Sequence, residues 1–338
     1  MQKLTNEVFR QSYVEEKIKE IFNQDVITES ITKVTGGLSN YLYRVSTPEG
    51  SLFFKQGLET PKNDEILKGV FTENNPFRLE SEKDALEILQ GYFPNDIKIP
   101  EVLNFDRKNN ILILTDAGGP NGNNLQDVLL EGVFDNSVAE KIGRFLGISH
   151  RITSDNAGNI RGSFFEDMSH WQNMLQARTV DVISEDLSSE VKIGLQGLAY
   201  DSLTTHTHPM LINMDCCPKN ILQNEDGSIG IVDFELACGL GDPAYDVGFC
   251  LGHYWIFAIL NNCPQNAETA HKELMKGYLK EMKRVEPEEI ENRIIQFAGA
   301  TILYRIFGAS PGPYITEAKK DELIETASKF ILEGTSPC

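Results

Sequence analysis

The sequence has no long apolar run, no paired-cysteine motif and no cluster of basic residues. The longest strongly apolar stretch, Val247–Leu260, is about 14 residues long and contains a histidine, so it is too short and too polar for a membrane span. The six cysteines form no C-x-x-C pair and no zinc-like spacing. The N-terminus lacks the pattern of a secretory signal. We therefore expect free thiols and a protein of the reducing cytoplasm.

Basic residues are outnumbered by acidic ones, 31 to 50, which gives a formal net charge of -19. This surplus repels nucleic-acid phosphates, and no run of five or more Lys or Arg offsets it, so nucleic acid is excluded as an expected partner. The negative charge would suit a cationic ligand, but a charge that only confers solubility explains it as well. With 338 residues, 41% of them hydrophobic, the chain is long enough for about two lobes that each bury a core.

The first part of the chain predicts a small, β-rich lobe. Apolar spacing from Val14 to Phe22, after a possible Ser12–Glu15 capping box, predicts a helix that ends near Asn23. Short β-rich runs broken by turn residues then predict a three-stranded antiparallel meander over residues 31–56. A helix over 77–90 and strands over 102–105 and 111–114 complete this part.

The turn-rich stretch Asp116–Gly122 predicts the boundary between the lobes. We assign residues 1–116 to a nucleotide-binding lobe and 117–338 to a mostly helical catalytic and substrate-binding lobe. In the second lobe, helical spacing covers 125–129, 137–153, 188–203, 244–260, 267–283, 287–307 and 314–332, with short strands at 210–212, 221–222 and 229–232. The predicted fold class is therefore α+β with two lobes.

The stretch NMDCCPKNIL (213–222), followed by IGIVDFE (229–235), carries the chemistry. Asp215, Asn220 five residues later and Asp233 after the next hairpin supply what phosphoryl transfer from ATP needs. One carboxylate accepts the proton of an attacking hydroxyl, while an amide oxygen and a second carboxylate hold magnesium. An Asp and an Asn in a turn also commonly satisfy backbone groups, so the combination of the two segments matters.

Together these segments resemble the catalytic and metal-binding loops of the protein-kinase-like small-molecule kinases, the aminoglycoside phosphotransferase and choline kinase superfamily. The resemblance extends from about Ile31 to Ala309. It implies a protein-kinase-like fold, the cofactors ATP and Mg2+, Asp215 as the base, and Asn220 and Asp233 as metal ligands.

The resemblance also assigns nucleotide-binding residues in the first lobe. The turn Gly36–Asn40 is similar to a phosphate-facing turn, and Lys55 ends an apolar strand where the family has its phosphate-pairing lysine. A helix carboxylate that positions this lysine would be Glu82, with Glu80 as the alternative. Residues 116–117 resemble the hinge that bonds the adenine edge. The implied nucleotide-binding residues are Gly37, Ser39, Asn40, Lys55, Glu82, Asp116 and Ala117.

Two positions depart from the family pattern. Asn213 replaces a histidine that braces the catalytic loop, and Cys217 stands where protein kinases have a lysine. Charge neutralisation at the transferred phosphate would then come from magnesium or from Lys219. The resemblance gives Asp246 a structural role in stabilising the loop.

The acceptor is predicted only as a class: a hydroxyl of a small polar molecule such as an aminoglycoside, amino sugar or amino alcohol. Glu235, Tyr254 and Trp255 are the candidate substrate residues, since an aromatic face binds a cation well. The two aromatic residues equally fit the core face of an apolar helix. An alternative function is a catalytically weakened, nucleotide-binding regulatory protein, because Asn213 replaces the histidine. The sequence does not determine the oligomeric state.

Overall fold

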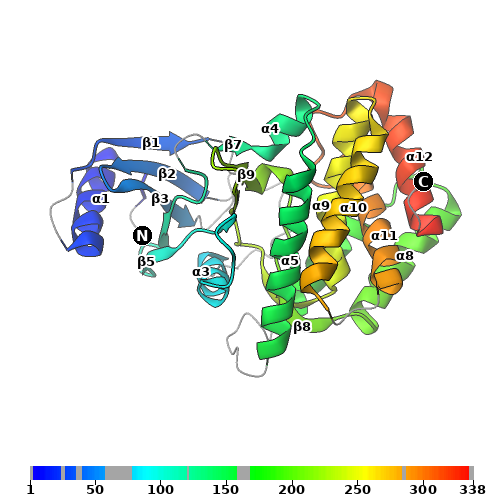
Figure 1. The fold of residues 1–338 in the computed structure, drawn as a ribbon, viewed down its shortest axis with the longest axis horizontal. Helices are drawn as coiled ribbons and strands as arrows, with labels where there is room; N and C mark the ends of the chain where they lie inside the picture. The colour runs from blue at the N-terminus through cyan, green and yellow to red at the C-terminus, as the bar shows by residue number, and fades with distance from the viewer. Residues whose placement is uncertain are drawn as a thin grey trace.

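The computed structural model describes residues 3–23, 27–35, 40–57, 78–119, 122–157, 168–283 and 287–334. A small region built around a β-sheet comes first, and a larger helical region follows and lies beside it (Figure 1). The predicted two-lobed α+β architecture is therefore confirmed. The placement of the lobe boundary at residue 116 stays a prediction.

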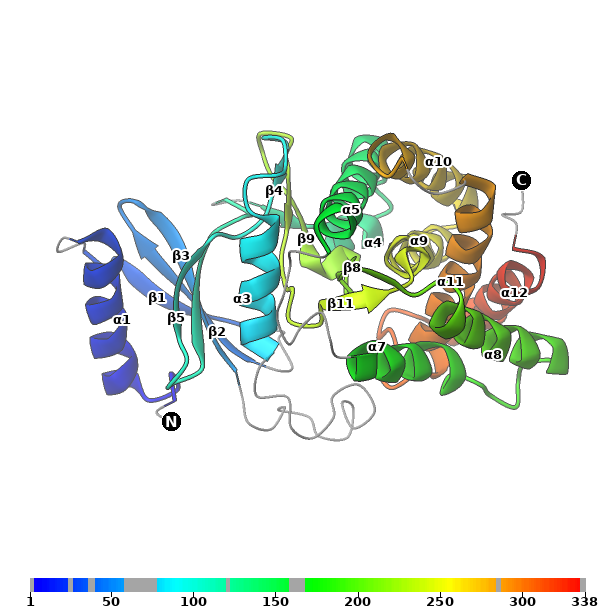
Figure 2. The same cartoon turned by 90° about the horizontal axis from the view of Figure 1, so that it is seen from below.

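The N-terminal sheet has the strand order β1-β2-β3-β6-β5, and every neighbouring pair is antiparallel. The first three strands are the predicted meander. The bounds are β1 (Ser30–Val34), β2 (Asn40–Thr47), β3 (Gly50–Gly57), β5 (Val102–Asp106) and β6 (Ile111–Thr115). One helix lies on each side of this sheet, and the second lies toward the helical lobe (Figure 2). These helices are α1 (Glu7–Phe22) and α3 (Arg78–Leu89).

Strand alternation sorts the side chains of this sheet between two cores. Phe54 and Ile113 are buried in the cluster that includes α1, whereas Leu112 and Leu114 belong to the cluster that includes α3. Successive residues of a strand point to opposite faces, so Lys55 points away from the face that holds Phe54. Lys55 therefore lies on the α3 side, toward the helical lobe.

Helix α1 begins earlier than the sequence predicted. Asn6 is its N-cap, and the Asn6 side chain accepts a hydrogen bond from the backbone N–H of Phe9. The Ser12 hydroxyl instead donates to the carbonyl of Val8, inside the helix, so the predicted Ser12–Glu15 capping box is wrong. The predicted end is confirmed, because Asn23 adopts the left-handed conformation at the C-cap.

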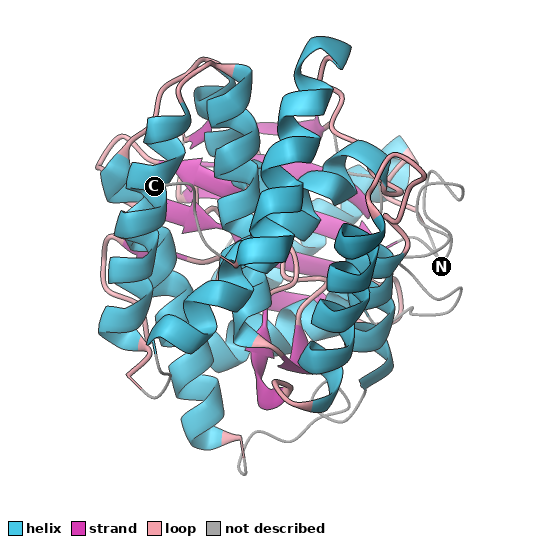
Figure 3. Ribbon diagram, turned by 90° about the vertical axis from the view of Figure 1, so that its right-hand side faces the viewer, coloured by secondary structure: helices cyan, strands magenta, loops and turns pink. Residues whose placement is uncertain are grey.

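The C-terminal lobe is a helical bundle that covers two small sheets (Figure 3). The apolar helix α9 lies inside it, and all of its residues from Pro243 to Ile259 are buried. The helices are α4 (Leu125–Leu130), α5 (Asn136–Asn156), α7 (Met168–Leu175), a π-helical turn (Gln176–Val180), α8 (Ser189–Thr204), α9 (Pro243–Leu260), α10 (Pro264–Glu281), α11 (Pro287–Phe307) and α12 (Glu317–Glu333).

The small sheets carry the loops that the sequence singled out. One has the order β4-β10-β9-β7, and the other pairs β11 with β8. Their strands are β4 (Ile97–Lys98), β7 (Asn123–Asn124), β8 (His208–Ile212), β9 (Ile221–Gln223), β10 (Ile229–Ile231) and β11 (Cys238–Gly241). Strands β8, β9 and β10 and most of the helices were predicted. Helix α7, the π-helical turn and strands β4, β7 and β11 were not.

None of the described helices combines the length and apolar character that crossing a membrane requires. The five described cysteines are all free, as predicted.

Helices α5 and α10 approach each other closely at two glycines. A Cβ atom on Gly143 would lie 2.0 Å from the carbonyl oxygen of Leu274, and one on Gly277 would lie 2.1 Å from that of Glu140. Only residues without a side chain permit this crossing, because neither backbone can yield without moving its helix. The crossing matters for the site, since α5 and α10 carry His150 and Tyr278, which support the loop described below.

We predict that Gly277→Val lowers the free energy of unfolding by about 3 kcal/mol, the upper part of the range for overpacked cores. The measurement is urea denaturation followed by circular dichroism. Gly197→Ala on α8 is the control, because nothing lies within 4 Å of its added Cβ. That variant should be as stable as the wild type or up to about 1 kcal/mol more stable. Wild-type stability of Gly277→Val would contradict the close crossing.

Candidate active site

Asp215 lies in the loop between β8 and β9, and only 8% of its surface is exposed. Its Oδ2 atom accepts a hydrogen bond from the Asn220 amide at 2.9 Å and pairs with Lys219 Nζ at 3.1 Å. Its Oδ1 atom pairs with Arg178 Nη2 at 3.2 Å. The Asn220 amide also donates to the Asp215 carbonyl. The carboxylate and the amide of the predicted motif are thus held side by side.

The charges around Asp215 keep it ionised. Burial alone would raise the pKa of this carboxyl group, but the ammonium of Lys219 and the guanidinium of Arg178 lower its pKa to about 2. Lys219 is held in its charged form by the same contact, which raises the pKa of its ammonium. At neutral pH the Asp215 carboxylate is therefore an acceptor of hydrogen bonds only.

Arg178 is the site residue that the sequence analysis missed. It lies in the π-helical turn and is 5% exposed, and its guanidinium donates to the Met214 carbonyl and to the Tyr245 hydroxyl as well as to Asp215. Its Cζ atom is 4.2 Å from the centre of the Phe249 ring. The apolar spacing of Trp171, Met174 and Leu175 could have predicted the preceding helix. No local signal identifies the arginine, because its partner is 37 residues away.

A buried carboxylate from α9 braces the loop that carries Asp215. Asp246 accepts hydrogen bonds from the backbone N–H groups of Asn213 at 2.7 Å and of Met214 at 2.9 Å. Its Oδ2 atom also lies 3.2 Å from His150 Nε2, and the other ring nitrogen lies 3.1 Å from the Tyr278 hydroxyl. Met214 adopts a positive φ of 69°, which is strained for a residue other than glycine. The hydrogen bonds from Asp246 hold the backbone in this conformation.

Asn213, which replaces the histidine of the family pattern, takes part in the same loop. Its side-chain oxygen accepts a hydrogen bond of 3.0 Å from the backbone N–H of Asp215. The loop is therefore supported from within by Asn213 and from outside by Asp246 and His150. The loop that carries Asp215 is therefore braced although Asn213 stands in place of the histidine.

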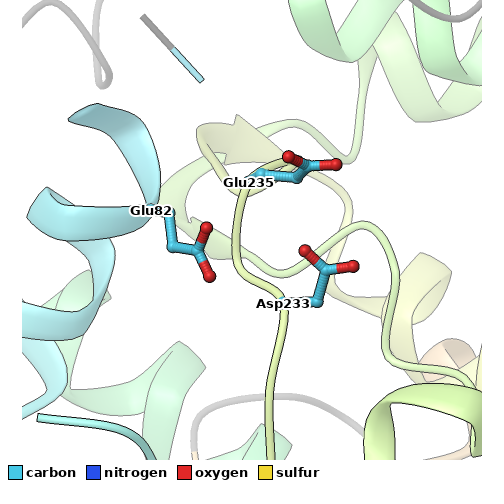
Figure 4. Close-up of side chains that lie close together, drawn as sticks. All are labelled: Glu82, Asp233 and Glu235. Atoms are coloured by element: carbon cyan, nitrogen blue, oxygen red, sulfur yellow. The ribbon is translucent and has the colours of Figure 1, made fainter. Parts of the chain in front are cut away.

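A second cluster gathers three carboxylates, of Glu82, Asp233 and Glu235 (Figure 4). Lys55 lies among them. Lys55 Nζ lies 2.7 Å from Glu82 Oε2, 2.6 Å from Asp233 Oδ1 and 3.8 Å from Glu235 Oε2. Glu82 comes from α3, whereas Asp233 and Glu235 follow β10. Glu80, the alternative to Glu82, pairs instead with the exposed Arg107. Geometry thus selects Glu82 as the partner of the lysine.

The Lys55 cluster has more negative than positive charge. Burial opposes the charged form of Lys55, but Asp233 and Glu82 outweigh it and raise the pKa of the ammonium. Burial, together with Asp233 and Glu235, raises the pKa of Glu82 to about 7, against the opposite effect of Lys55. One oxygen from each of the three carboxylates lies within 4.8 Å of the others. This donor set of hard oxygens fits a divalent cation such as Mg2+.

Backbone pairing brings the two clusters together. The N–H of Val232 donates to the carbonyl of Asn220 at 3.0 Å, so Asn220 lies beside the residue that precedes Asp233. Asp233 itself has a positive φ of 68°, a rare conformation for a residue other than glycine. Asp215, Asn220 and Asp233, predicted as one site, lie on adjoining segments.

The remaining nucleotide-binding predictions have mixed outcomes. Gly37 and Ser39 lie outside the described residues. Asn40, expected to face phosphates, donates a hydrogen bond of 2.6 Å to Glu235 Oε2 and so ties the first lobe to the second cluster. In the hinge segment, Asp116 pairs with Arg44 at 2.9 Å, and the Ala117 carbonyl accepts a hydrogen bond from Asn224.

The structure places the predicted aromatic substrate residues in the core. Tyr254 is 1% exposed and packs near Phe134, and Trp255 is 2% exposed and packs edge-on against Phe330. Neither ring offers a face to a ligand, which corrects the prediction that they bind an ammonium group. The alternative, aromatic residues on the buried face of an apolar helix, is what the structure contains. Glu235 lies in the Lys55 cluster and is held there by Asn40.

Residues 30–286 match the phosphotransferase enzyme family. The chain belongs to this family. It is 26% identical over 292 residues to the 4-hydroxytryptamine kinase of Psilocybe cubensis, an alignment that covers 77% of this chain and 76% of the relative. The predicted small-molecule phosphotransferase is thereby confirmed as the enzyme class.

Solved structures of kinases have the same fold as this phosphotransferase. The choline kinase LicA from Streptococcus pneumoniae has a TM-score of 0.53 and 17% identity, and the alignment covers 95% of this chain and 98% of that one. The GDP complex of aminoglycoside 2'-phosphotransferase-IIIa also has a TM-score of 0.53 and 17% identity, with 96% and 97% of the two chains covered. The predicted protein-kinase-like fold is confirmed.

We predict that Asp246→Asn destabilises this phosphotransferase by about 1–3 kcal/mol, the usual cost of a buried hydrogen-bonding group left without its partner. An amide has one acceptor oxygen where the carboxylate has two, so the N–H groups of Asn213 and Met214 lose one acceptor. Urea denaturation measures the loss. The matched control is Asp201→Asn on the exposed side of α8, which should change stability by less than about 0.5 kcal/mol. Equal effects would contradict the bracing role.

Proposed function

We propose that this phosphotransferase moves the γ-phosphoryl group of ATP to a hydroxyl group of a small polar molecule. The observation that carries the proposal is that Asp215 and Asn220 lie on one segment and Asp233 follows the adjoining one, where it pairs with Lys55, itself paired with Glu82. Phosphoryl transfer is catalysed mainly by positioning and by electrostatic stabilisation, and these groups supply both. The named relatives, kinases of 4-hydroxytryptamine and choline, support it.

Asp215 binds the hydroxyl group of the acceptor. Its carboxylate is ionised at neutral pH and accepts a hydrogen bond from the attacking hydroxyl, which aligns the oxygen with the phosphorus and takes up its proton as the bond forms. A base with a pKa of about 2 gains little by removing a proton early. Orientation of the hydroxyl is therefore its main contribution, with proton transfer late in the reaction.

Lys55 and Asp233 hold the nucleotide side of the site. Lys55, fixed by Glu82, neutralises phosphate oxygens of ATP, and Asp233 with the amide oxygen of Asn220 holds Mg2+. When bound, the metal neutralises charge that develops on the phosphates. The three carboxylates around one ammonium leave the negative surplus that such a cation requires. Gly37, Ser39 and Asn40 on the phosphates and Asp116–Ala117 at the adenine complete the proposed nucleotide site.

The acceptor is proposed only as a class. Aminoglycosides, amino sugars and amino alcohols are the acceptors predicted from the sequence, and the names of the relatives support an amine-bearing molecule. The side chains chosen to bind that amine give no such support, because Tyr254 and Trp255 are buried and Glu235 is bonded to Asn40.

Asp215→Asn should reduce acceptor-dependent ADP release by at least about a hundredfold, since an amide cannot take up the proton of the hydroxyl. A coupled assay with Mg·ATP measures it across choline, ethanolamine, aminoglycosides, methylthioribose, homoserine and hexosamines. Mg·ATP should still raise the melting temperature of the variant, and Asp201→Asn should keep wild-type rates. A protein that binds Mg·ATP but phosphorylates nothing in this panel would favour the regulatory alternative.

Asp233→Asn should raise the Mg2+ concentration that gives half-maximal activity by at least about tenfold. Removing groups that only orient metal ligands already costs about 10- to 100-fold in affinity, and Asp233 is proposed as a ligand itself. The measurement is a Mg2+ titration of ADP release at saturating ATP. Glu80→Gln, which removes a carboxylate of α3 outside the cluster, should leave the titration unchanged. An unchanged titration for Asp233→Asn would remove it from the metal site.

A further inference from the structure

Two cations pair with the Asp215 carboxylate, and they differ in their exposure to solvent. Arg178, which lies 3.2 Å from Oδ1, is buried and also donates to the Met214 carbonyl and to the Tyr245 hydroxyl. Lys219 lies 3.1 Å from Oδ2, and 48% of its side chain is exposed. A ligand that approaches Asp215 from solvent can therefore contact the ammonium of Lys219, whereas the guanidinium of Arg178 is enclosed by the protein.

The Lys219 ammonium has hydrogen-bond donors to spare. Among the residues that the structure describes, Asp215 is the only one with which this ammonium forms an ion pair or a hydrogen bond. An ammonium group has three N–H donors and no acceptor, so the contact with Asp215 leaves two of them for a ligand. Hydrogen bonds from a cation are strongest to anionic oxygen atoms, such as those of a phosphoryl group.

The backbone that carries Lys219 is held in place from two sides. Lys219 belongs to a short 3-10 helix, Pro218–Asn220, and its carbonyl oxygen accepts a hydrogen bond of 2.6 Å from the side chain of Asn124, the N-cap of α4. The next residue, Asn220, donates from its amide to Asp215. The flexible lysine side chain therefore starts from a fixed point between the proposed base and the proposed metal ligand Asn220.

Cys217, at the position where protein kinases have a lysine, supplies no charge to the site. It is 2% exposed and packs in the main hydrophobic core of the protein. A thiol that is buried among apolar side chains stays neutral. Lys219, two residues later, contacts the Asp215 carboxylate and remains half exposed. The positive charge that Cys217 lacks is thus present beside Asp215, on a different residue of the same loop.

We propose that Lys219 is a catalytic residue, which donates a hydrogen bond to an oxygen of the transferred phosphoryl group while Asp215 holds the acceptor hydroxyl. The inference rests on the proposed function and deepens it. In the reaction, the bond between the γ-phosphorus and the oxygen of ADP breaks as the bond to the hydroxyl oxygen forms, and the hydroxyl proton goes to Asp215. Lys219 keeps its proton, so it contributes positive charge next to the phosphoryl oxygens and takes no part in proton transfer.

Lys219 and Lys55 then act on opposite sides of the transferred group. Lys55 pairs with Glu82 and Asp233 and is proposed to neutralise the phosphates of ATP. Lys219 pairs with Asp215, where the acceptor hydroxyl binds. Because phosphoryl transfer is catalysed mainly by positioning and by charge stabilisation, a cation on the acceptor side stabilises the phosphoryl group as its bond to ADP lengthens.

Tetrafluoroaluminate tests this role without a known acceptor, because with Mg·ADP it mimics the phosphoryl group in the transition state. The measurement is the tetrafluoroaluminate concentration that gives the half-maximal thermal shift of the full chain with Mg·ADP. Lys219→Met should raise it at least about tenfold, the loss expected for one charged hydrogen bond, and should keep the wild-type shift with Mg·ADP alone. Lys219→Arg keeps a cation and should stay within about threefold of the wild type. Lys98→Met is the matched control, because Lys98 is 41% exposed and also pairs with a carboxylate, at 2.7 Å.

The Asp215→Asn background distinguishes a direct contact from an effect that passes through Asp215. We expect Lys219→Met to weaken tetrafluoroaluminate binding at least about tenfold in this background too, since the cation contacts the phosphoryl group itself. No further loss in the double variant, or wild-type binding in Lys219→Met, overturns the proposal. Loss of the Mg·ADP shift in Lys219→Met would place Lys219 on the nucleotide and also overturn it, as would wild-type protein that binds Mg·ADP but not tetrafluoroaluminate. Failure of Mg·ADP to bind the wild type would instead refute the proposed function.

Discussion

The ammonium of Lys55 links the two lobes of the protein. It comes from the central strand of the first sheet and contacts Glu82 on α3 and Asp233 after β10, so a single charge joins three elements. A buried ion pair of this kind contributes little net stability, because desolvation offsets the attraction. Losing Lys55 is costly, however, because the Glu82 carboxylate would remain buried without its counter-charge. The contact therefore fixes geometry more than it stabilises the fold.

The two ends of the site have opposite charge, and each suits the ligand proposed for it. Around Lys55, carboxylates exceed cations, which favours a metal ion. Around Asp215, cations exceed carboxylates, which keeps this carboxylate ionised. The pairing of Val232 with Asn220 brings the two environments together across one pair of strands. In the proposed reaction, the phosphoryl group would pass from the Lys55 cluster to a side already rich in positive charge.

Sequence reasoning succeeded where the required signal is local. Asp215, Asn220 and Asp233 lie within one short stretch, and strand alternation places Phe54 and Lys55 on opposite faces. It failed where two partners are distant in the sequence, and where the burial of a side chain determines whether that side chain can contact a ligand. Arg178 meets Asp215 only through the tertiary fold, and its π-helical turn has no signature of its own. Tyr254 and Trp255 have the residue type of a cation site, but α9 is buried on every side, so they pack in the core.

Total charge also proved a poor guide to the charge at the site. The surplus of 19 acidic groups describes the chain as a whole, and most charged residues are solvated and screened within about 10 Å at moderate salt. The carboxylate of Asp215 instead pairs with Arg178, which is buried beside it, where the local dielectric is lower and each charge acts more strongly. The charge next to Asp215 therefore follows from the position of Arg178, whose guanidinium packs on the Phe249 ring of α9.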